Sequence, residues 1–428
     1  MTIQQSTPNA VIPARLHPSG FEKSDSSFYS LSLASDGNIY YSLSSHDLNT
    51  HGRVYRYEPS SDRVTFLGDL GELTGEFGQK TIPQGKSHCP FFECDGKLYL
   101  STQYGFFLSS GDKERPAGVP EGYRAYPGGH FLSYDLASGR FEDLVTGPAE
   151  EGIIAMQLDP ARKRIYGLTW PKGCFLVYDI STRLLRNLGK VSREGEAGEG
   201  ENYFCLCRSL GLWPETGDVY FTNADGEILR YSFMRDIVES VAGVNMKRDI
   251  FGAWDPHKPG HQGYNWRDIF WHEKEKVFYG IHPKSAWLFR FDPALPRLTL
   301  LDRICAQELR ESGRFELFRY GYLTLRPGPD GRTIYYLTSG ELPVNDGRRV
   351  KEVVRLVTYH LPTGRYCDHG MLQLPDGRSP QMAHTLVVHP NGKLYSCPWI
   401  ELEPFRANAD GQAQCECDLI SFSQVNSG

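Results

Sequence analysis

The stretch Gly152–Lys190, GIIAMQLDPARKRIYGLTWPKGCFLVYDISTRLLRNLGK, decides the fold. It holds four short runs of β-branched, aromatic and aliphatic residues, separated by turn formers such as Asp-Pro and Trp-Pro-Lys-Gly. Runs of this length and composition, without a helical period, indicate β-strands. The stretch therefore predicts a four-stranded antiparallel sheet. Its strands are predicted at Ile153–Leu158, Ile165–Leu168, Phe175–Asp179 and Leu184–Leu188.

The same unit recurs along the chain. The turn between its first two strands has counterparts at nearly equal intervals, and a third-strand pattern accompanies each of them. The turns are Asp36-Gly37, Asp95-Gly96, Asp159-Pro160, Thr216-Gly217, Lys274-Glu275, Asp330-Gly331 and Asn391-Gly392. The third strands begin at Arg53, His130, Cys174, Glu227, Trp287, Arg355 and Asp418. One such sheet cannot bury both faces, so seven copies predict an all-β, seven-bladed β-propeller in which neighbouring sheets pack together.

The ends of the chain fit this prediction. We expect residues 1–428 to form a single propeller domain. The last repeat has only three strands, because the chain stops soon after Ile420–Ser423. An unpaired sheet edge invites aggregation, so a strand from Ala10–Leu16 is predicted to complete the last blade. Helix is nearly absent, and Arg303–Ser312 is the one short helix predicted.

Composition excludes several classes of partner. The 44 Gly and 27 Pro supply turns, and the 24 Tyr and 23 Phe supply packing between sheets. A net charge of -6 with interspersed signs argues against nucleic acid. No run approaches the roughly 20 apolar residues of a membrane span.

The cysteines and the N-terminus bear on the compartment. The ten cysteines show neither the spacing of a zinc site nor the density of a small disulfide-rich domain, and no secretory signal is visible. We expect a cytoplasmic protein with buried thiols, or a secreted one if a leader has been trimmed.

Candidate site residues follow from blade topology. The segment before an innermost strand and the loop between the second and third strands emerge on the same face of a blade. His88, Tyr203, Arg208, Tyr264, Trp266, Tyr320 and His384 lie on or before innermost strands, and His46, His130, Trp170, His282 and Trp399 lie on the loops. They are predicted to converge on the mouth of the central channel. A concave pocket of this kind is the default binding site of a ring.

Each candidate has a structural alternative. The histidines and tyrosines also suit hydrogen-bonded packing roles, and the tryptophans suit both sugar stacking and packing between blades. Arg208 needs an anion, because an unpaired guanidinium in the channel is costly. That anion is either an internal carboxylate such as Glu201 or the carboxylate of a substrate. The Gly/Glu-rich link Ser192–Glu201 is predicted to be a solvent-exposed loop.

Four stretches carry a resemblance to a known family. They are Lys86–Leu100, which begins KSH, Tyr126–Leu144 (YPGGHFLSYDLASGRFEDL), Glu151–Ile180 and Gly263–Trp271 (GYNWRDIFW). The chain resembles bacterial seven-bladed propeller proteins similar to polysaccharide lyases of the ulvan-lyase type. This resemblance implies cleavage of a uronate-containing polysaccharide by β-elimination. The long loop between His88 and His130 departs from the family pattern.

The resemblance also implies roles for individual residues. Paired histidines and a tyrosine abstract and return protons in such lyases, and an arginine neutralises the substrate carboxylate. The corresponding catalytic residues are His88, His130, Tyr203, Arg208 and Tyr264. The predicted substrate-binding residues are Trp170, Trp266, His282, His384 and Trp399. The chemistry is sound, because an arginine stabilises the carbanion formed beside a carboxylate and a neutral histidine is a suitable base.

Two other classes of function stay open. A metal-dependent hydrolase or lactonase would need oxygen ligands for a divalent cation, for which Glu151, Glu201 and Asn223 are the candidates. A transition metal would instead use the histidines, namely His88, His130, His282 and His384. A non-catalytic module that binds carbohydrate or protein is the third alternative, since the fold alone implies no activity.

Overall fold

The computed structural model describes residues 10–110, 113–116, 118–247, 251–257, 262–313, 324–343, 350–404, 406 and 414–423. Strands dominate these residues. The described helical segments are α1 (Leu70–Leu73), α2 (Gln307–Ser312) and the 3-10 turns η1 (Gly195–Ala197) and η2 (Gly200–Asn202). The helix α2 lies inside the stretch predicted to be helical. Across the described residues, no helix has the length and apolar character needed to cross a bilayer.

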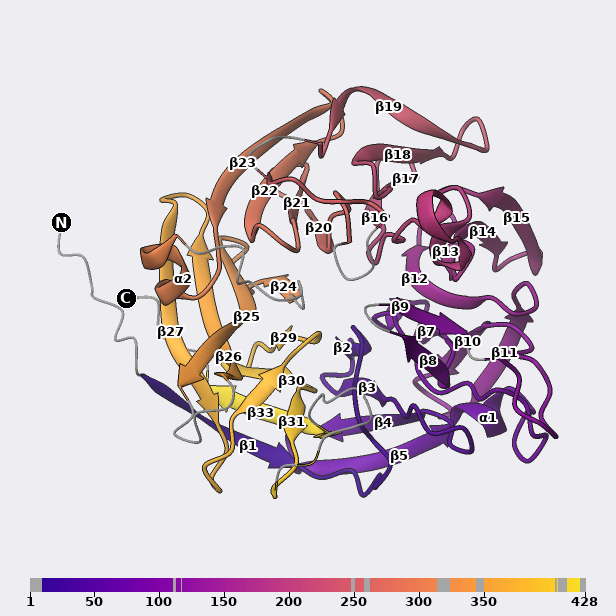
Figure 1. Cartoon of the computed structure of the whole chain (residues 1–428), viewed down its shortest axis with the longest axis horizontal. Helices are drawn as coiled ribbons and strands as arrows, with labels where there is room; N and C mark the ends of the chain where they lie inside the picture. The colour runs from indigo at the N-terminus through magenta and orange to yellow at the C-terminus, as the bar shows by residue number, and fades with distance from the viewer. Residues whose placement is uncertain are drawn as a thin grey trace.

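Five separate sheets each contain four antiparallel strands. The first two are β2 (Leu31–Leu33), β3 (Ile39–Leu43), β4 (Arg53–Glu58), β5 (Arg63–Asp69), and β6 (Phe92–Cys94), β7 (Lys97–Ser101), β10 (His130–Asp135), β11 (Phe141–Thr146). The third is β12 (Gly152–Asp159), β13 (Arg164–Trp170), β14 (Cys174–Asp179), β15 (Leu184–Lys190). The fourth and fifth are β16 (Gly211–Trp213), β17 (Asp218–Thr222), β18 (Glu227–Ser232), β19 (Ile237–Asn245), and β20 (Asp268–His272), β21 (Val277–Ile281), β22 (Trp287–Asp292), β23 (Arg297–Arg303). Figure 1 shows them arranged around a common centre.

The third sheet shows why the repeat folds in this way, and its four strands confirm those predicted from Gly152–Lys190. The residues of β13 and β14 are almost all buried, whereas β15 at the rim is partly exposed. The connecting turns place Lys163 and Arg183 at φ of 51° and 57°, in the left-handed region that tight turns use. Between sheets, Phe175 stacks on Phe221 with ring centroids 5.1 Å apart. Aromatic stacking of this kind holds adjacent sheets together.

The remaining large sheet has eight strands and not four. It contains β24 (Thr324–Pro327), β25 (Thr333–Pro343), β26 (Val350–His360), β27 (Arg365–Gln373), β29 (Val387–Val388), β30 (Lys393–Ser396), β33 (Leu419–Ser423) and β1 (Val11–His17). The first half of β1 pairs with β27 in parallel, and the second half pairs with β33 antiparallel. The described propeller sheets therefore number six and not the seven predicted, because β1 joins two four-stranded groups.

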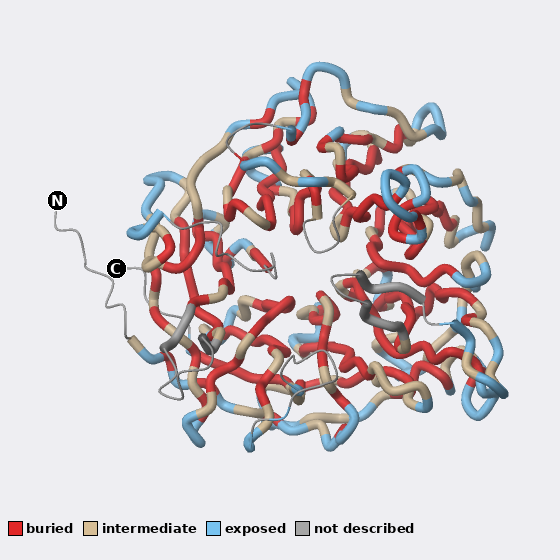
Figure 2. The backbone as a smooth tube through the Cα atoms, viewed as in Figure 1, coloured by how far each residue is buried: buried red, intermediate tan, exposed pale blue. Residues whose placement is uncertain are grey.

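Two smaller sheets lie outside this pattern. One contains β28 (Pro380–Met382), β31 (Trp399–Glu401) and β32 (Cys415–Cys417), and the other is the hairpin of β8 (Phe107–Ser110) and β9 (Lys113–Pro116). Burial is greatest along the strands, and the turns at the outer rim are exposed (Figure 2). Eight of the ten cysteines are buried, as expected for thiols within strands.

Candidate active site

The first strands of the sheets surround a central cavity of about 420 Å³. Its wall includes residues of β2, β6, β12, β20, β24 and β29, together with the residues that lead into β16. Tyr29, His88 and Arg208 contribute polar side chains to this wall. His88 and Arg208, which the topology argument assigned to the channel, are thus among the residues that line this cavity.

Two histidines and three cations form what we call the channel cluster: Lys86, His88, Arg208, Arg267 and His384. Each lies on a segment that leads into the first strand of a different sheet, apart from Lys86 and His88, which share one. All five side chains are buried or nearly so. A guanidinium nitrogen of Arg267 lies 3.5 Å from Nδ1 of His384. The cluster brings three cations to the axis of the ring, where Glu196 pairs with Arg208 and Asp268 of the cavity wall pairs with Arg326.

An aromatic residue that the sequence did not single out joins the two histidines. The ring of Phe28 stacks on His88 with centroids 5.1 Å apart, and its centroid lies 5.2 Å from that of His384. The ammonium group of Lys86 lies 4.6 Å from the centroid of the same ring. Trp399, a predicted substrate-binding residue, contacts Phe28 edge-on at 5.7 Å. Phe28 and Tyr29 precede the first strand of their sheet, as His88 and Arg208 do in theirs. That shared position could have identified Phe28 and Tyr29 from the sequence.

Burial keeps both histidines of the channel cluster neutral. The pKa of His88 lies well below 6.5, chiefly because of burial and then because Lys86 and the two arginines repel a proton. Burial, Arg267 and Lys86 lower the pKa of His384 in the same way. The Nδ1 atom of His88 lies 2.8 Å from the carbonyl oxygen of Ile154. A carbonyl oxygen only accepts, so Nδ1 carries the proton and Nε2 carries the lone pair.

The tautomer of His384 is the opposite one. Arginine only donates, so the contact from Arg267 makes Nδ1 of His384 an acceptor. In a neutral imidazole the proton then lies on Nε2. The channel cluster therefore holds one neutral imidazole whose Nε2 can accept and one whose Nε2–H can donate a hydrogen bond.

Arg208 is held by an internal carboxylate, but that carboxylate is Glu196 and not Glu201. The Nη2 atom of Arg208 lies 2.7 Å from Oε1 of Glu196, and Nη1 donates to the carbonyl oxygen of Leu206 at 2.9 Å. Glu196 also accepts from the indole of Trp170 at 2.7 Å. The expectation of a solvent-exposed loop at Ser192–Glu201 is therefore wrong for Glu196, which is buried. Trp170 is likewise buried, with its indole directed at Glu196 and not at a ligand.

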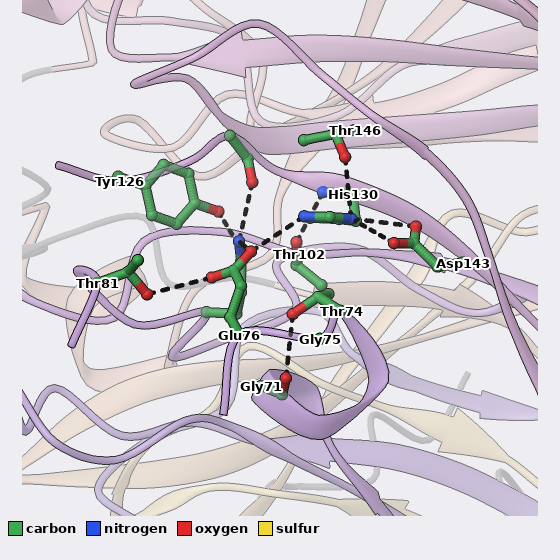
Figure 3. Close-up of polar contacts among 12 residues, drawn as sticks. Gly71, Thr74, Gly75, Glu76, Thr81, Thr102, Tyr126, His130, Asp143 and Thr146 are labelled. Atoms are coloured by element: carbon green, nitrogen blue, oxygen red, sulfur yellow. Dashed lines mark hydrogen bonds and ion pairs between the residues drawn. The ribbon is translucent and has the colours of Figure 1, made fainter. Parts of the chain in front are cut away.

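The structure does not pair His130 with His88. His130 opens the third strand β10, and both of its ring nitrogens bind carboxylates (Figure 3). Nδ1 lies 2.9 Å from Asp143, and Nε2 lies 3.1 Å from Glu76. Burial lowers the pKa of His130, but the two carboxylates outweigh it and raise the pKa to about 9. A doubly ion-paired imidazole is a structural cation and is not available as a base.

The predicted tyrosines also have internal partners. Tyr203 is buried, and its hydroxyl accepts from the thiol of Cys205 at 3.8 Å. Burial, followed by the nearby carboxylate of Glu196, raises the pKa of Tyr203. The hydroxyl of Tyr264 donates to the carbonyl oxygen of Gly252 at 3.2 Å. Arg208 of the channel cluster is among the charges that act on Tyr203. Tyr320 lies outside the described residues.

Two further predicted binding residues pack inside the ring. Trp266 is fully buried, and its indole donates to the carbonyl oxygen of Ser209 at 2.9 Å. His282 is fully buried, stacks on Phe251 and contacts the hydroxyl of Ser285 through Nδ1 at 2.9 Å. Burial lowers the pKa of His282 to about 3. Both residues therefore serve packing in this structure.

The three residues proposed as oxygen ligands of a metal each contact a different partner within the chain. Glu151 accepts from the hydroxyl of Thr169, Glu201 is exposed beside His257, and Asn223 donates to Glu227. Throughout the residues that the structure describes, no group of three or more His, Cys, Asp and Glu side chains is arranged to share a metal ion.

Comparison with known proteins identifies the fold. No protein-family model matches the chain, and no curated protein does either. A chain in the crystal structure of the mitotic checkpoint complex has a TM-score of 0.53 at 10% identity, covering 100% of this chain and 95% of that one. The Cps50 (Swd1) β-propeller domain of Myceliophteria thermophila has a TM-score of 0.51 at 11% identity, covering 94% of this chain and 99% of that domain. This chain is a β-propeller.

An enzyme is also among the similar propellers. The periplasmic gluconolactonase PpgL of Pseudomonas aeruginosa has a TM-score of 0.50 at 14% identity, covering 91% of this chain and 99% of that chain. Identities this low establish the shared architecture alone, because one fold serves many activities. Function has to be argued from the channel cluster.

Proposed function

We propose that this propeller is a carbohydrate lyase that cleaves an acidic, uronate-containing oligosaccharide by β-elimination at the channel cluster. The observation that carries the proposal is the neutral His88 enclosed by Lys86, Arg208 and Arg267. The ulvan-lyase-type activity implied by the sequence resemblance belongs to the same proposal. Cations at this position favour an anionic substrate, and a neutral imidazole among them favours proton abstraction.

The cluster supplies each group that β-elimination needs. In the proposed reaction the uronate carboxylate lies between Arg208 and the cations Lys86 and Arg267. Glu196 already offsets the charge of Arg208 in part, and the three cations together offset the charge that develops as the C5 proton leaves. Nε2 of His88 takes that proton, the C5–C4 double bond forms, and the C4–O bond breaks. The imidazolium of His88 then gives this proton to the departing C4 oxygen, and Nε2–H of His384 donates a hydrogen bond to the same oxygen. His88 returns to its neutral form, so protons and charges balance without a co-reactant.

The arginine role can be tested with a change that keeps the charge. Arg208→Lys should lower kcat by about tenfold or more, because lysine lacks the fork that fixes a carboxylate. Arg230→Lys in the same sheet is the matched control, since Arg230 bonds Glu239 away from the cavity. Steady-state kinetics on an acidic oligosaccharide measures both variants. Unchanged kcat in Arg208→Lys would remove Arg208 from the proposed mechanism.

The lowered pKa values predict the pH profile. A base must be unprotonated, and the pKa of His88 lies well below 6.5. The value of kcat/KM should therefore stay level as the pH falls through 6.5 and decline only in more acid solution. Ultraviolet absorbance of the unsaturated uronate product, recorded for a panel of polyuronates, measures this profile. A decline centred on the ordinary histidine pKa would contradict a buried neutral base.

Lactone hydrolysis is the second candidate. The neutral His88 that supports elimination also suits activation of water, and Arg208 suits an oxyanion. The gluconolactonase named above shares the architecture, although its likeness extends to the fold alone. Acid release from gluconolactone without an unsaturated product would favour this alternative. Binding of acidic sugars with neither reaction would favour a non-catalytic module.

We also infer that the eight-stranded sheet acts as two four-stranded blades. The pairing of β1 with β33 and the separate run β24–β27 support this division. The ring then has seven blades, with β1 completing the last one, and its single channel serves as the substrate site.

A further inference from the structure

A cysteine of the second sheet and a lysine of the third sheet meet outside the channel. Cys94 is the last residue of β6, and Lys163 is the last residue of the turn from β12 to β13. The ammonium nitrogen of Lys163 donates to Sγ of Cys94 at 3.2 Å and also to the carboxylate of Asp95. The thiol lies 3.9 Å from the carbonyl oxygen of Pro160 in the same turn. The sulfur of one sheet therefore lies against the turn of the next.

The backbone holds both partners at this spacing. Asp95 and Lys163 each have a φ of 51°, in the left-handed region that tight turns use. The carbonyl oxygen of Lys163 accepts from the N–H of Ile180 at 3.0 Å. In the other turn, the carbonyl oxygen of Gly96 accepts from the N–H of Leu136 at 3.0 Å. Each turn is thus tied to the third strand of its own sheet, and only the lysine side chain has to move to bring nitrogen and sulfur together.

The surroundings of Cys94 suit reaction with a small oxidant. An ammonium group at hydrogen-bond distance stabilises a thiolate, which is the nucleophilic form of cysteine. Cys94 is 6% exposed, but its contact Lys163 has a side chain that is 34% exposed and reaches solvent. Cys89 offers a contrast, because its sulfur accepts from the hydroxyl of Ser101 and burial raises its pKa to about 12. We expect Cys89 to remain an unreactive thiol.

We propose that Cys94 and Lys163 form a covalent cross-link when the protein meets hydrogen peroxide. The cross-link joins the second and third sheets between residues that are 69 positions apart in the sequence. It is a modification site distinct from the channel cluster, and it does not rest on the proposed lyase activity.

The chemistry balances with one molecule of peroxide for each cross-link. The Cys94 thiolate attacks a peroxide oxygen, the O–O bond breaks, and the products are a sulfenic acid and hydroxide. The hydroxide takes a proton from the Lys163 ammonium and becomes water. The resulting amine attacks the sulfur, the S–O bond breaks, a second water leaves, and an S–N bond forms. The sulfur is oxidised by two electrons, the peroxide is reduced, and the thiol and amine together lose two hydrogen atoms.

The test follows the bond by mass spectrometry of the full chain. The protein is treated with hydrogen peroxide at about pH 9, where more lysine is neutral than at pH 7, and is digested without reducing agent. We expect a joined pair of peptides that contain Cys94 and Lys163, absent before oxidation and separated again by dithiothreitol. Cys89 in the same digest should stay unmodified.

Two lysine variants decide the partner. Lys163→Arg keeps the positive charge beside Asp95, but its guanidinium does not lose a proton to act as the nucleophile. It should give no joined pair, and Cys94 should proceed to sulfinic acid instead. Lys276→Arg is the matched control, because Lys276 ends the equivalent turn of the fifth sheet, at φ of 54°, and pairs there with Glu273. Its yield of the joined pair should equal that of the wild type.

Thermal unfolding gives an independent measure of the same bond. A bond across this span restricts the unfolded chain, so the oxidised wild type should melt about 5 °C above the reduced protein. The same treatment should produce no rise in Lys163→Arg. An unreactive Cys94, a wild-type Cys94 that goes to sulfinic acid without a joined pair, or an equal rise in Lys163→Arg would each overturn the proposal.

Discussion

Replacement of His88 by alanine is expected to abolish β-elimination while the propeller stays folded. The imidazole supplies the lone pair at Nε2 that removes the C5 proton, and loss of a general base costs about 10²- to 10⁴-fold in rate. Folding should survive because His88 faces the cavity and its one hydrogen bond is to the carbonyl oxygen of Ile154. The measurements are initial rates of unsaturated-uronate formation and the thermal midpoint.

His389→Ala is the control for this experiment. His389 is partly exposed on a turn and bonds the carbonyl oxygen of Gly37, away from the channel. It should retain full activity. Wild-type rates in His88→Ala would end the assignment of the base. A large fall in the thermal midpoint of His88→Ala, with activity restored on cooling, would assign His88 a structural role instead.

Removal of His130 is expected to cause the largest loss of stability. His130→Ala leaves the buried carboxylate of Glu76 without its cation, which costs about 3 kcal/mol or more of the free energy of unfolding. Urea unfolding at neutral pH measures this loss. His360→Ala, at the partly exposed end of β26 where the histidine bonds the hydroxyl of Thr363, should leave the unfolding midpoint nearly unchanged.

The same change has a defined pH dependence. The pKa of His130 is about 9 in the folded chain, above its ordinary value of 6.5. The folded state therefore binds the proton more tightly than the unfolded state. This contribution is complete below about pH 6.5 and is lost as the pH rises through about 9. The stability deficit of His130→Ala should be largest in mildly acid solution and smaller near pH 10. A deficit that grows with pH would contradict the ion-pair interpretation.

The repeats of the sequence were sufficient to predict the propeller, because turn residues and strand length are local properties. The turn at Asp159-Pro160 separates β12 from β13 where it was expected. The number of separate sheets was not predictable in this way. Whether β1 also bonds β27 depends on the backbone pairing of Val11 with Met371, which no local pattern encodes.

The candidate site was predictable in position but not in partners. His88, Arg208 and His384 were found because they precede first strands, and strand order fixes where such segments lie. Their surroundings depend on contacts between distant segments. Glu196 was taken for an exposed residue because its neighbours are Gly and Glu, yet Arg208 and Trp170 bury it. His130 was expected at the channel from its position in the blade. The carboxylates that hold it, Glu76 and Asp143, come from other elements, so the sequence around His130 does not reveal them.

The pairing of β1 with β33 has a consequence for synthesis on the ribosome. Residues 11–17 are translated long before their antiparallel partner at 419–423. Until that partner has been made, the β1 segment lacks it and remains open to association with other chains. A nascent chain of this protein is therefore expected to depend on chaperones until residues 419–423 have left the ribosome.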